Sequence, residues 1–425
     1  MSNAFPRILR VQQNFPASPP LDLAATLTRE FEKARPQIKP RARIAVAVGS
    51  RGITNLSRIV SSVLEVLRGA GAEPFIVPAM GSHGGATPEG QTEILGTYGI
   101  TETAMKTPIR ASMETRQLSV TEEGAPVFCS QEALSADGIV LINRIKPHTD
   151  FSGTLGSGLL KMCVIGLGKR DGAAAMHAAA SRLGYERAIR SMARAILRQA
   201  PIICGVGLIE NQYHETVKIA VLPREQIESA ENQLFLESRD LMPKLPFEEI
   251  DLLIVDFLGK NISGAGMDPN VTGRWVHGYS SSLMRDGHPA PFVRRIFVRD
   301  LTPETHGNAV GIGLADITTS RVVQAMDRRV TCLNSLTALT PQCAKIPIHF
   351  DTDREAIERA LASLALSDVR SARVVRIRDT LSLGDLEVSE GLAGEVKLQA
   401  NLKALNGAEE FRFDKEGNLL PIARS

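Results

Sequence analysis

Short apolar runs that alternate with amphipathic segments are the feature that most constrains the fold of this chain. Four such runs lie in the first half, at Ile44–Val48, Pro74–Pro78, Gly138–Ile142 and Ile202–Leu208. Runs of this length are typical of parallel strands that are buried on both faces. Residues 56–67, between the first two runs, have apolar positions at helical spacing. This β-α-β alternation predicts a parallel sheet covered by helices.

A second domain is expected after Met242–Pro246, where two prolines fall within five residues. Beyond it, strands are predicted at 251–255 and 295–298, and a helix is predicted over 307–326. We therefore expect an α/β fold of two α/β domains, with mostly parallel sheets and an active-site cleft between them. The expected boundaries are 1–245 for the first domain, 246–385 for a second domain that closes the cleft, and 386–425 for a tail that could return to the first domain.

The composition argues against nucleic-acid and membrane partners. The net charge is only +2, aromatic residues make up 4% of the chain, and no apolar run reaches the roughly 18 residues of a membrane span. The N-terminus lacks the apolar core of a signal peptide. The five cysteines are dispersed, without a CxxC pair. We therefore expect a cytoplasmic protein with reduced thiols and without a cysteine-based zinc site.

One lysine, Lys161, stands in the apolar run Gly158–Gly166, with His148 before it and His177 after it. Loss of hydration lowers the pKa of a lysine in such a setting, and the resulting neutral amine can carry a covalent cofactor or form a Schiff base. The alternative is a lysine that extends from a buried helix to water. The flanking histidines add metal ligands or proton-transfer groups at neutral pH. On these residues alone, both interpretations of the lysine stay open.

Polar, glycine-rich loops follow four of the predicted strands. Three lie in the first domain and contain Arg51, then His83, then Arg144 with His148; the fourth, Gly259–Asn270, follows the first strand of the second domain. Because ligands of open α/β sheets bind at the carboxyl ends of the strands, two histidines at separate strand ends indicate a site. Either arginine could bind phosphate or carboxylate, or be a surface charge. The sequence contains no dinucleotide-binding fingerprint, P-loop, GxSxG elbow or HExxH motif.

Four motifs follow one another in a fixed order: a glycine-flanked histidine at Gly81–Gly84, the pair Pro147-His148, a glycine-rich loop with lysine at Ser152–Lys161, and His177. In this order they resemble the lactate racemase family, the 2-hydroxyacid racemases and epimerases that depend on a nickel-pincer nucleotide. The resemblance spans roughly residues 40–185.

The resemblance implies a role for each of these residues. Lys161 would hold the cofactor, a pyridinium-3-thioamide-5-thiocarboxylic acid mononucleotide with nickel, through a thioamide bond. His177 would be the protein ligand to nickel. His83 and His148 would be the paired acid and base groups, one for each side of the substrate carbon.

Further binding residues are implied on both domains. Arg51 and Ser82 would bind the cofactor phosphate or the substrate carboxylate. The resemblance is weaker in the second domain, where the candidates for the substrate side of the cleft are Lys260, Asp268, Asn270 and Arg274. Apart from the resemblance, His306 stands just before a predicted helix, where it could bind a substrate anion or merely cap the helix.

The implied reaction inverts C2 of a 2-hydroxyacid by hydride transfer to the nickel-pincer nucleotide, with two histidines as acid and base. One alternative is a sugar-acid epimerase or a dehydrogenase with the same cofactor. Another is a non-catalytic protein that binds a nucleotide or an anion. The expected partners are a small-molecule 2-hydroxyacid and, transiently, the enzymes that make the cofactor. Neither nucleic acid nor a membrane is expected, and a homo-oligomer is left open.

Overall fold

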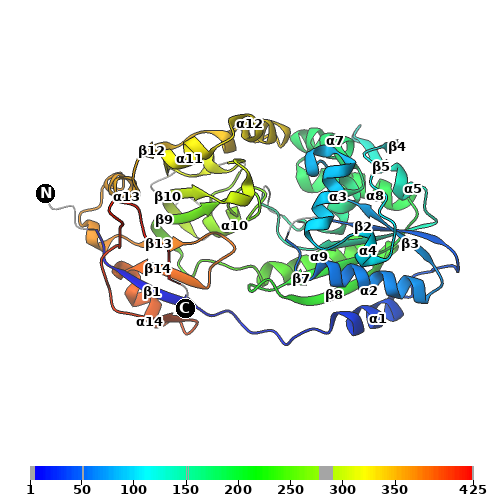
Figure 1. The fold of residues 1–425 in the computed structure, drawn as a ribbon, viewed down its shortest axis with the longest axis horizontal. Helices are drawn as coiled ribbons and strands as arrows, with labels where there is room; N and C mark the ends of the chain where they lie inside the picture. Colours follow the sequence, from blue (N-terminus) through cyan, green and yellow to red (C-terminus); the bar gives the residue numbers. More distant parts are fainter. Residues whose placement is uncertain (1–4, 50–51, 150, 152, 277–290, 424–425) are drawn as a thin grey trace. The chain divides into compact units, whose positions relative to one another are not determined.

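The computed structural model describes residues 5–49, 52–149, 151, 153–276 and 291–423. These residues form two compact units. The first, which we name the lysine unit because it contains Lys161, comprises Ala17–His148 and Ser152–Met242. The second, which we name the terminal unit because it contains both chain ends, comprises Met1–Pro16, Thr149–Phe151 and Pro243–Ser425. The predicted α/β class is confirmed in both units (Figure 1).

A five-stranded sheet forms the centre of the lysine unit, in the order β3-β2-β6-β7-β8. The first four strands are parallel, and β8 pairs antiparallel with β7. The strands are β2 (Arg43–Val48), β3 (Glu73–Pro78), β6 (Gly138–Arg144), β7 (Ile202–Glu210) and β8 (Thr216–Pro223). The four runs predicted as parallel strands are therefore strands of one sheet. A separate hairpin pairs β4 (Thr115–Val120) with β5 (Pro126–Ser130).

Helices connect these strands. They are α1 (Leu23–Ala34), α2 (Leu56–Gly69), α3 (Pro88–Thr97), α4 (Glu102–Met105), α5 (Gln131–Leu134), α6 (Leu159–Lys161), α7 (Lys169–Leu183), α8 (Tyr185–Gln199) and α9 (Ile227–Asp240), with 3-10 turns η1 (Gly84–Ala86) and η3 (Arg224–Gln226) and a π-helix η2 (Met162–Gly166). The apolar faces of α1 and α2 pack on one face of the sheet, against residues such as Val46 and Val140. On the other face, Leu159 of α6 and Leu234 of α9 approach β7 at Gly205 and Gly207.

The terminal unit has an eight-stranded mixed sheet, in the order β12-β11-β10-β9-β13-β14-β1-β15. The strands from β12 to β13 are parallel, and those from β13 to β15 are antiparallel to their neighbours. The strands are β1 (Ile8–Gln13), β9 (Glu249–Leu258), β10 (Phe292–Leu301), β11 (Ile317–Thr319), β12 (Ile348–Phe350), β13 (Val374–Ile377), β14 (Asp385–Ser389) and β15 (Leu402–Ala404). Its helices are α10 (Pro269–Thr272), α11 (Ser320–Ala325), α12 (Arg328–Thr337), α13 (Asp353–Ala362) and α14 (Ala393–Leu398), with 3-10 turns η4 (Pro303–Thr305), η5 (Ile312–Leu314), η6 (Pro341–Ala344), η7 (Val369–Ser371) and η8 (Glu390–Leu392).

The helix predicted over 307–326 is wrong. That stretch contains the turn η5, the strand β11 and the short helix α11. The strand residues Ile317–Thr319 are all β-branched, which favours extended backbone, and Ile317 pairs with Phe297 of β10. Gly311 has a left-handed φ of 100°, and a Cβ atom there would lie 1.7 Å from the carbonyl oxygen of Ala265. Sheet pairing and close backbone packing therefore override the apparent helical spacing.

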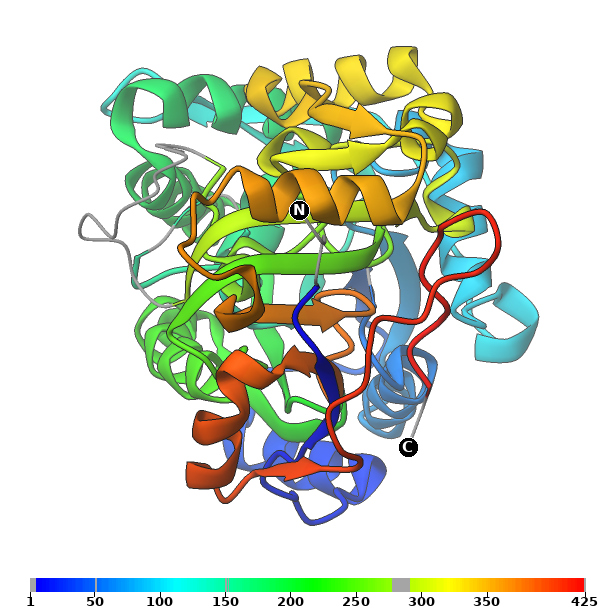
Figure 2. The ribbon, with the colours of Figure 1, turned by 90° about the vertical axis from the view of Figure 1, so that its left-hand side faces the viewer.

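The two ends of the chain differ from the expected domain boundaries. The N-terminal strand β1 pairs with β14 and β15, so Met1–Pro16 belongs to the terminal unit. Figure 2 shows this dark-blue strand beside the orange and red strands of the tail. The tail 386–425 likewise stays in the terminal unit instead of returning to the first domain. Both chain ends belong to this unit because β1, near the N-terminus, pairs antiparallel with β14 and β15, near the C-terminus.

Two further observations concern the chain as a whole. Within the described residues, no helix has the length and apolar character needed to span a membrane. The five cysteines are free thiols; four are buried and Cys332 is exposed. Burial raises the pKa of the Cys163 thiol, close to Lys161 in sequence, well above its ordinary value.

Candidate active site

The candidate residues of the lysine unit follow the carboxyl ends of neighbouring parallel strands. His83 follows β3, and His148 follows β6. Strand β2 lies between these two strands in the sheet. Because adjacent strands are about 4.8 Å apart, the ends of β3 and β6 are separated by about 10 Å. The fold therefore brings the two histidine loops to the same edge of the sheet, on either side of β2.

The connection from β6 to Lys161 is held at its base. The backbone N–H of Lys146 donates to the carbonyl of Ser157 (2.9 Å), and the N–H of Ser157 donates back (2.8 Å). The side-chain amide of Asn143 donates to the carbonyl of Gly158 at 2.8 Å. Two residues before Lys161, the Leu159 side chain is fully buried. These bonds fix where the short helix α6 starts, and therefore where Lys161 lies.

Small residues on β7 make room for this turn. A Cβ atom on Gly205 would lie 2.7 Å from the Leu159 side chain. Gly205 and Gly207 do not belong to a dinucleotide fingerprint. Gly205 allows the segment that carries Lys161 to pack directly on the sheet, and Gly207 makes room for the side chain of Ile145, which a Cβ atom would approach to 2.8 Å.

Lys161 and His148 are in direct contact. The Nζ atom of Lys161 lies within hydrogen-bonding distance of the Nε2 atom of His148. Both side chains are partly exposed, whereas Leu160 and Met162 on either side of the lysine are buried. An ammonium can only donate, so a charged Lys161 requires His148 Nε2 to be the acceptor of this contact. This arrangement makes an amine with a proton acceptor beside it.

A buried carboxyl group lies under the start of the same turn. Glu231 of α9 is 1% exposed, and its carboxylate accepts a hydrogen bond from the backbone N–H of Leu160 at 2.9 Å. Burial raises the pKa of Glu231 to about 7, although hydrogen bonds from the Leu160 and Leu159 backbone act in the opposite direction.

The loop that carries His83 depends on glycines. Gly81 and Gly84 have left-handed φ angles of 65° and 63°. A Cβ atom on Gly84 would lie 2.4 Å from the carbonyl carbon of Gly90, and one on Gly81 would lie 2.8 Å from the side chain of Ile165. Ile165 belongs to the π-helix that follows Lys161, so the His83 loop packs against the Lys161 segment.

Two fully buried polar residues support this loop. Lys169, at the start of α7, donates to the carbonyl of Pro78 and to the side-chain oxygen of Gln91. The Gln91 amide in turn donates to the carbonyls of Gly81 and His83. Burial lowers the pKa of Lys169 to about 8.

His177, the predicted nickel ligand, lies on α7, which the π-helix η2 joins to the Lys161 segment. The His177 side chain is partly exposed, and its ring makes an edge-to-face contact with Tyr185, with centroids 6.1 Å apart. An aromatic contact of this kind restrains the orientation of the imidazole. Within the described part of the chain, no group of three or more His, Cys, Asp or Glu side chains is placed to hold a metal ion.

The predicted anion-binding residues differ in placement. Arg51 lies outside the described residues. Ser82 is exposed in the His83 loop. Arg144 forms an ion pair with the buried Glu210 and donates to the carbonyl of Gly52 at 2.9 Å. Arg144 therefore supports the loop after β2 and is not merely a surface charge; its binding of a phosphate or carboxylate ligand stays a prediction.

The candidates from the second domain lie in the terminal unit. Asp268 is buried and caps α10: its carboxylate accepts from the backbone N–H and the side-chain amide of Asn270, both at 2.9 Å. The Lys260 ammonium donates to the carbonyl of Gly264. His306 is exposed and ends the turn η4 with a left-handed φ of 48°. A substrate role for these residues stays a prediction.

Arg274 is 5% exposed and forms an ion pair with Asp316 at 2.7 Å. Its guanidinium also donates to the carbonyls of Val293 and Arg294. These bonds tie the segment after α10 to β10, so the described contacts of Arg274 are structural.

Three buried residues of the site were missed by sequence reasoning: Gln91, Lys169 and Glu231. Gln91 and Glu231 are bonded directly to the backbone of the His83 loop and of the turn before Lys161, whereas Lys169 is bonded to Gln91 and to the carbonyl of Pro78 at the end of β3. The one available signal in the sequence is Lys169, a charged residue directly after Gly168 at the end of the apolar run.

The residues present fit a covalently held cofactor. The Lys161 amine is partly exposed and touches an imidazole. At Gly49 and Gly81 a Cβ atom would crowd or collide with the Asn143 and Ile165 side chains, so these two glycines let the neighbouring loops pack closely around the segment that carries Lys161.

Two comparisons with known proteins give a match. Residues 26–187 match the family model described as lactate racemase N-terminal domain. Among solved structures, the chain is similar to the lactate racemase apoprotein from Thermoanaerobacterium thermosaccharolyticum, with 14% sequence identity, a TM-score of 0.51 and coverage of 88% of this chain and 99% of that one. At this identity the likeness shows the fold alone. No curated protein matches the chain.

Proposed function

We propose that the chain is a racemase or epimerase that inverts C2 of a 2-hydroxyacid, because residues 26–187 match the lactate racemase N-terminal domain. We further propose that it uses a nickel-pincer nucleotide held on Lys161. The observation that carries the proposal is the contact between Lys161 and His148 at the end of β6. It joins the amine that would hold the cofactor to one of the two acid/base histidines.

Racemisation requires proton transfer at the hydroxyl oxygen of either enantiomer. One imidazole must take the hydroxyl proton while the other supplies a proton to the opposite configuration. His83 and His148 follow strands on either side of β2, which supports acid/base groups on two sides of one substrate. Histidine suits both roles because its ordinary pKa lies near neutral pH.

Lys161 and His177 would hold the cofactor and its metal. When bound, such a cofactor supplies a hydride acceptor and donor for the substrate carbon. The protein's part is to position the substrate and to move the hydroxyl proton at the histidine nitrogens. Before the cofactor is attached, His148 Nε2 is placed to accept a proton from the Lys161 ammonium, which would leave the amine free to form its bond.

The test is to produce the protein together with nickel and the enzymes that make the cofactor, beside a Lys161→Ala variant. We expect an added mass on the intact wild-type chain, with about one nickel per chain, and neither in the variant. The loaded protein is then screened for loss of optical purity of single enantiomers of 2-hydroxyacids, from lactate to sugar acids. A folded wild-type protein without added mass and without nickel would overturn the cofactor assignment. A loaded protein that racemises no 2-hydroxyacid would overturn the reaction.

A further inference from the structure

Lys169 is a buried cation that the proposed mechanism does not use. It has no exposed surface, and its φ angle of 54° lies in the left-handed region that non-glycine residues rarely adopt. Burial lowers the pKa of its ammonium to about 8, so this residue costs stability at neutral pH. A methionine of similar length would avoid that cost. What the lysine adds is its hydrogen bonds.

Those bonds lead to the His83 loop. The Nζ atom of Lys169 donates to the carbonyl of Pro78, the last residue of β3, and to the Oε1 atom of Gln91 at 3.0 Å. Gln91 of α3 is also fully buried. Its Nε2 atom donates to the carbonyl of Gly81 at 2.8 Å and is within 3.4 Å of the carbonyl of His83.

The lysine fixes the direction of the glutamine amide. An ammonium only donates, so Gln91 must turn its oxygen toward Lys169. Its amide nitrogen then faces the two backbone carbonyls on either side of Ser82. Without the lysine, the amide would lose the partner that sets its orientation, and the loop would lose a bond on each side of Ser82.

We propose that Lys169 is a positioning residue for His83: through Pro78 and Gln91 it holds the loop that presents the His83 imidazole. An effect of Lys169 on catalysis rests on the proposed acid/base role of His83. The positioning itself can be tested without cofactor or substrate, so the two can fail separately.

The experiment measures the His83 imidazole by NMR in the cofactor-free protein. The signal of its Cε1–H group is assigned from a His83→Gln spectrum, and its shift is followed from pH 5 to pH 9. The variants are Lys169→Met and Gln91→Met. The matched control is Arg170→Met, which removes the neighbouring, exposed cation. Thermal unfolding of each variant is measured alongside.

We expect both test variants to move the His83 signal and its titration midpoint, and the control to leave both unchanged. The His349 ring, whose described partner Ser320 lies in the terminal unit, should not move in any variant. Because Lys169 and Gln91 act in series, the double variant should change the signal no more than Lys169→Met alone. An effect of general destabilisation would instead spread to other histidines and accumulate in the double variant.

Folded variants with an unchanged His83 signal would overturn the proposal. Should Lys169→Met fail to fold, Gln91→Met decides, because it keeps the Lys169–Pro78 bond. In loaded enzyme, Lys169→Met should lower kcat about tenfold to a hundredfold with little change in KM or in cofactor mass. A displaced His83 signal in a protein that shows no racemase activity in any form would mean that the positioning is real and the proposed function is not.

Discussion

The carboxylate of Glu231, on α9, accepts a hydrogen bond from the backbone N–H of Leu160 at 2.9 Å. Leu160 directly precedes Lys161, and α9 follows it in sequence by more than sixty residues. The turn that presents the candidate cofactor lysine is therefore held from below by a buried carboxyl group. The tight fit of this carboxyl against the turn leads to one prediction, and its burial leads to another.

Replacing Gly158 with alanine should destabilise the lysine unit. A Cβ atom there would lie 2.1 Å from the Oε1 atom of Glu231, so either the turn or the carboxyl must move. We expect a loss of about 1–3 kcal/mol of unfolding free energy, which is the usual range for overpacking a filled site. Denaturant unfolding measures it. The control is Gly96→Ala, where the added methyl meets open space within a helix and should be neutral or slightly stabilising. Equal stabilities for the two variants would contradict the fit.

Replacing Glu231 with glutamine should change how stability depends on pH. Burial raises the pKa of Glu231 from an ordinary value of 4.5 to about 7. Between these values the folded state binds a proton that the unfolded state has released, so stability falls as pH rises from about 4.5 to 7. Above pH 7 the loss is complete, at about 3 kcal/mol. Glutamine keeps the acceptor oxygen and cannot ionise.

Between pH 5 and pH 8 the unfolding temperature of wild type should therefore fall relative to that of Glu231→Gln. Thermal unfolding at four pH values in that window measures it. Glu93→Gln, on the exposed face of α3, is the control and should follow the wild-type curve. Parallel curves for Glu231→Gln and wild type would show that the buried carboxyl does not titrate in this window.

The parts of the fold that could be predicted from sequence are those with a strong local pattern. The runs at Ile44–Val48, Gly138–Ile142 and Ile202–Leu208 are continuous apolar segments, and all three are strands in the structure. The helix predicted over 307–326 failed because β11 has only three residues, and its pairing with β10 decides its conformation. The pairing of β1 with β14 has no local signal at all, since the partners are separated by nearly the whole chain.

The candidate site divides in the same way. The proximity of His148 and Lys161 could be anticipated because both lie on one strand-end connection, which the resemblance also singled out. Lys169, Gln91 and Glu231 could not be anticipated. In sequence they look like ordinary surface residues, and only the packing of distant helices makes them buried supports of a loop. Burial of a polar side chain depends on tertiary structure, which periodicity does not report.

The pairing of Lys161 with His148 predicts selective amine reactivity in the cofactor-free protein. A neutral amine reacts with aldehydes, whereas an ammonium does not. We expect Lys161 to be labelled first when pyridoxal 5′-phosphate and borohydride are added at pH 7, and His148→Gln to slow this labelling about tenfold. Peptide mass spectrometry measures the labelled fraction at each lysine. The His177→Gln variant is the control and should label like wild type. Uniform labelling of exposed lysines, with no preference for Lys161, would contradict the pairing.

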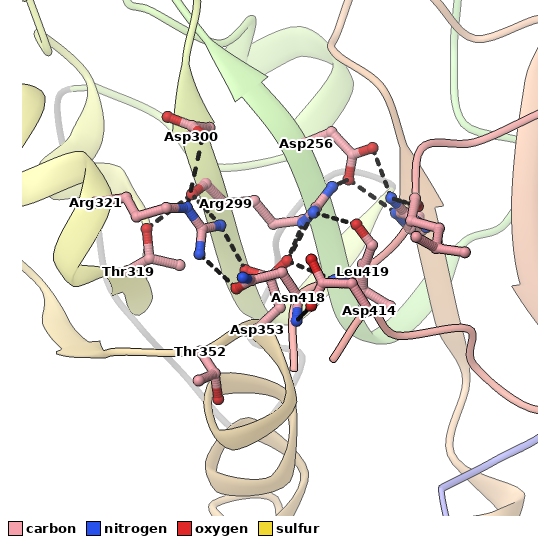
Figure 3. A network of polar contacts seen from close by, with 12 residues as sticks. Asp256, Arg299, Asp300, Thr319, Arg321, Thr352, Asp353, Asp414, Asn418 and Leu419 are labelled. Carbon is pink, nitrogen blue, oxygen red and sulfur yellow. Dashed lines mark hydrogen bonds and ion pairs between the residues drawn. The ribbon is translucent and has the colours of Figure 1, made fainter. Parts of the chain in front are cut away.

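The last prediction concerns a buried network of ion pairs in the terminal unit, shown in Figure 3. Asp353, at the start of α13, is fully buried. Its carboxylate pairs with Arg299 at 2.6 Å and with Arg321 at 2.8 Å, and it accepts from the backbone N–H of Leu419 at 2.9 Å. Arg299 also donates to the carbonyl of Leu419. The Asp353 carboxylate therefore bridges two arginines and fastens the C-terminal segment, while Asp256 pairs with Arg299 and Asp300 pairs with Arg321.

Asp353→Asn should lower the free energy of unfolding of the terminal unit by about 3–5 kcal/mol, because it leaves two partly buried guanidinium groups without the negative charge between them. Hydrogen exchange at the Leu419 amide should accelerate first, since that amide loses its charged acceptor while the sheet persists. The matched control is Asp351→Asn, two residues earlier, exposed and bonded only through Ser320 among its described contacts; it should cost less than about 1 kcal/mol. If both variants unfold alike, the tail is held by its apolar contacts and not by this carboxylate. If Asp353→Asn is destabilised while exchange at Leu419 is unchanged, the carboxylate stabilises the sheet and does not fasten the tail.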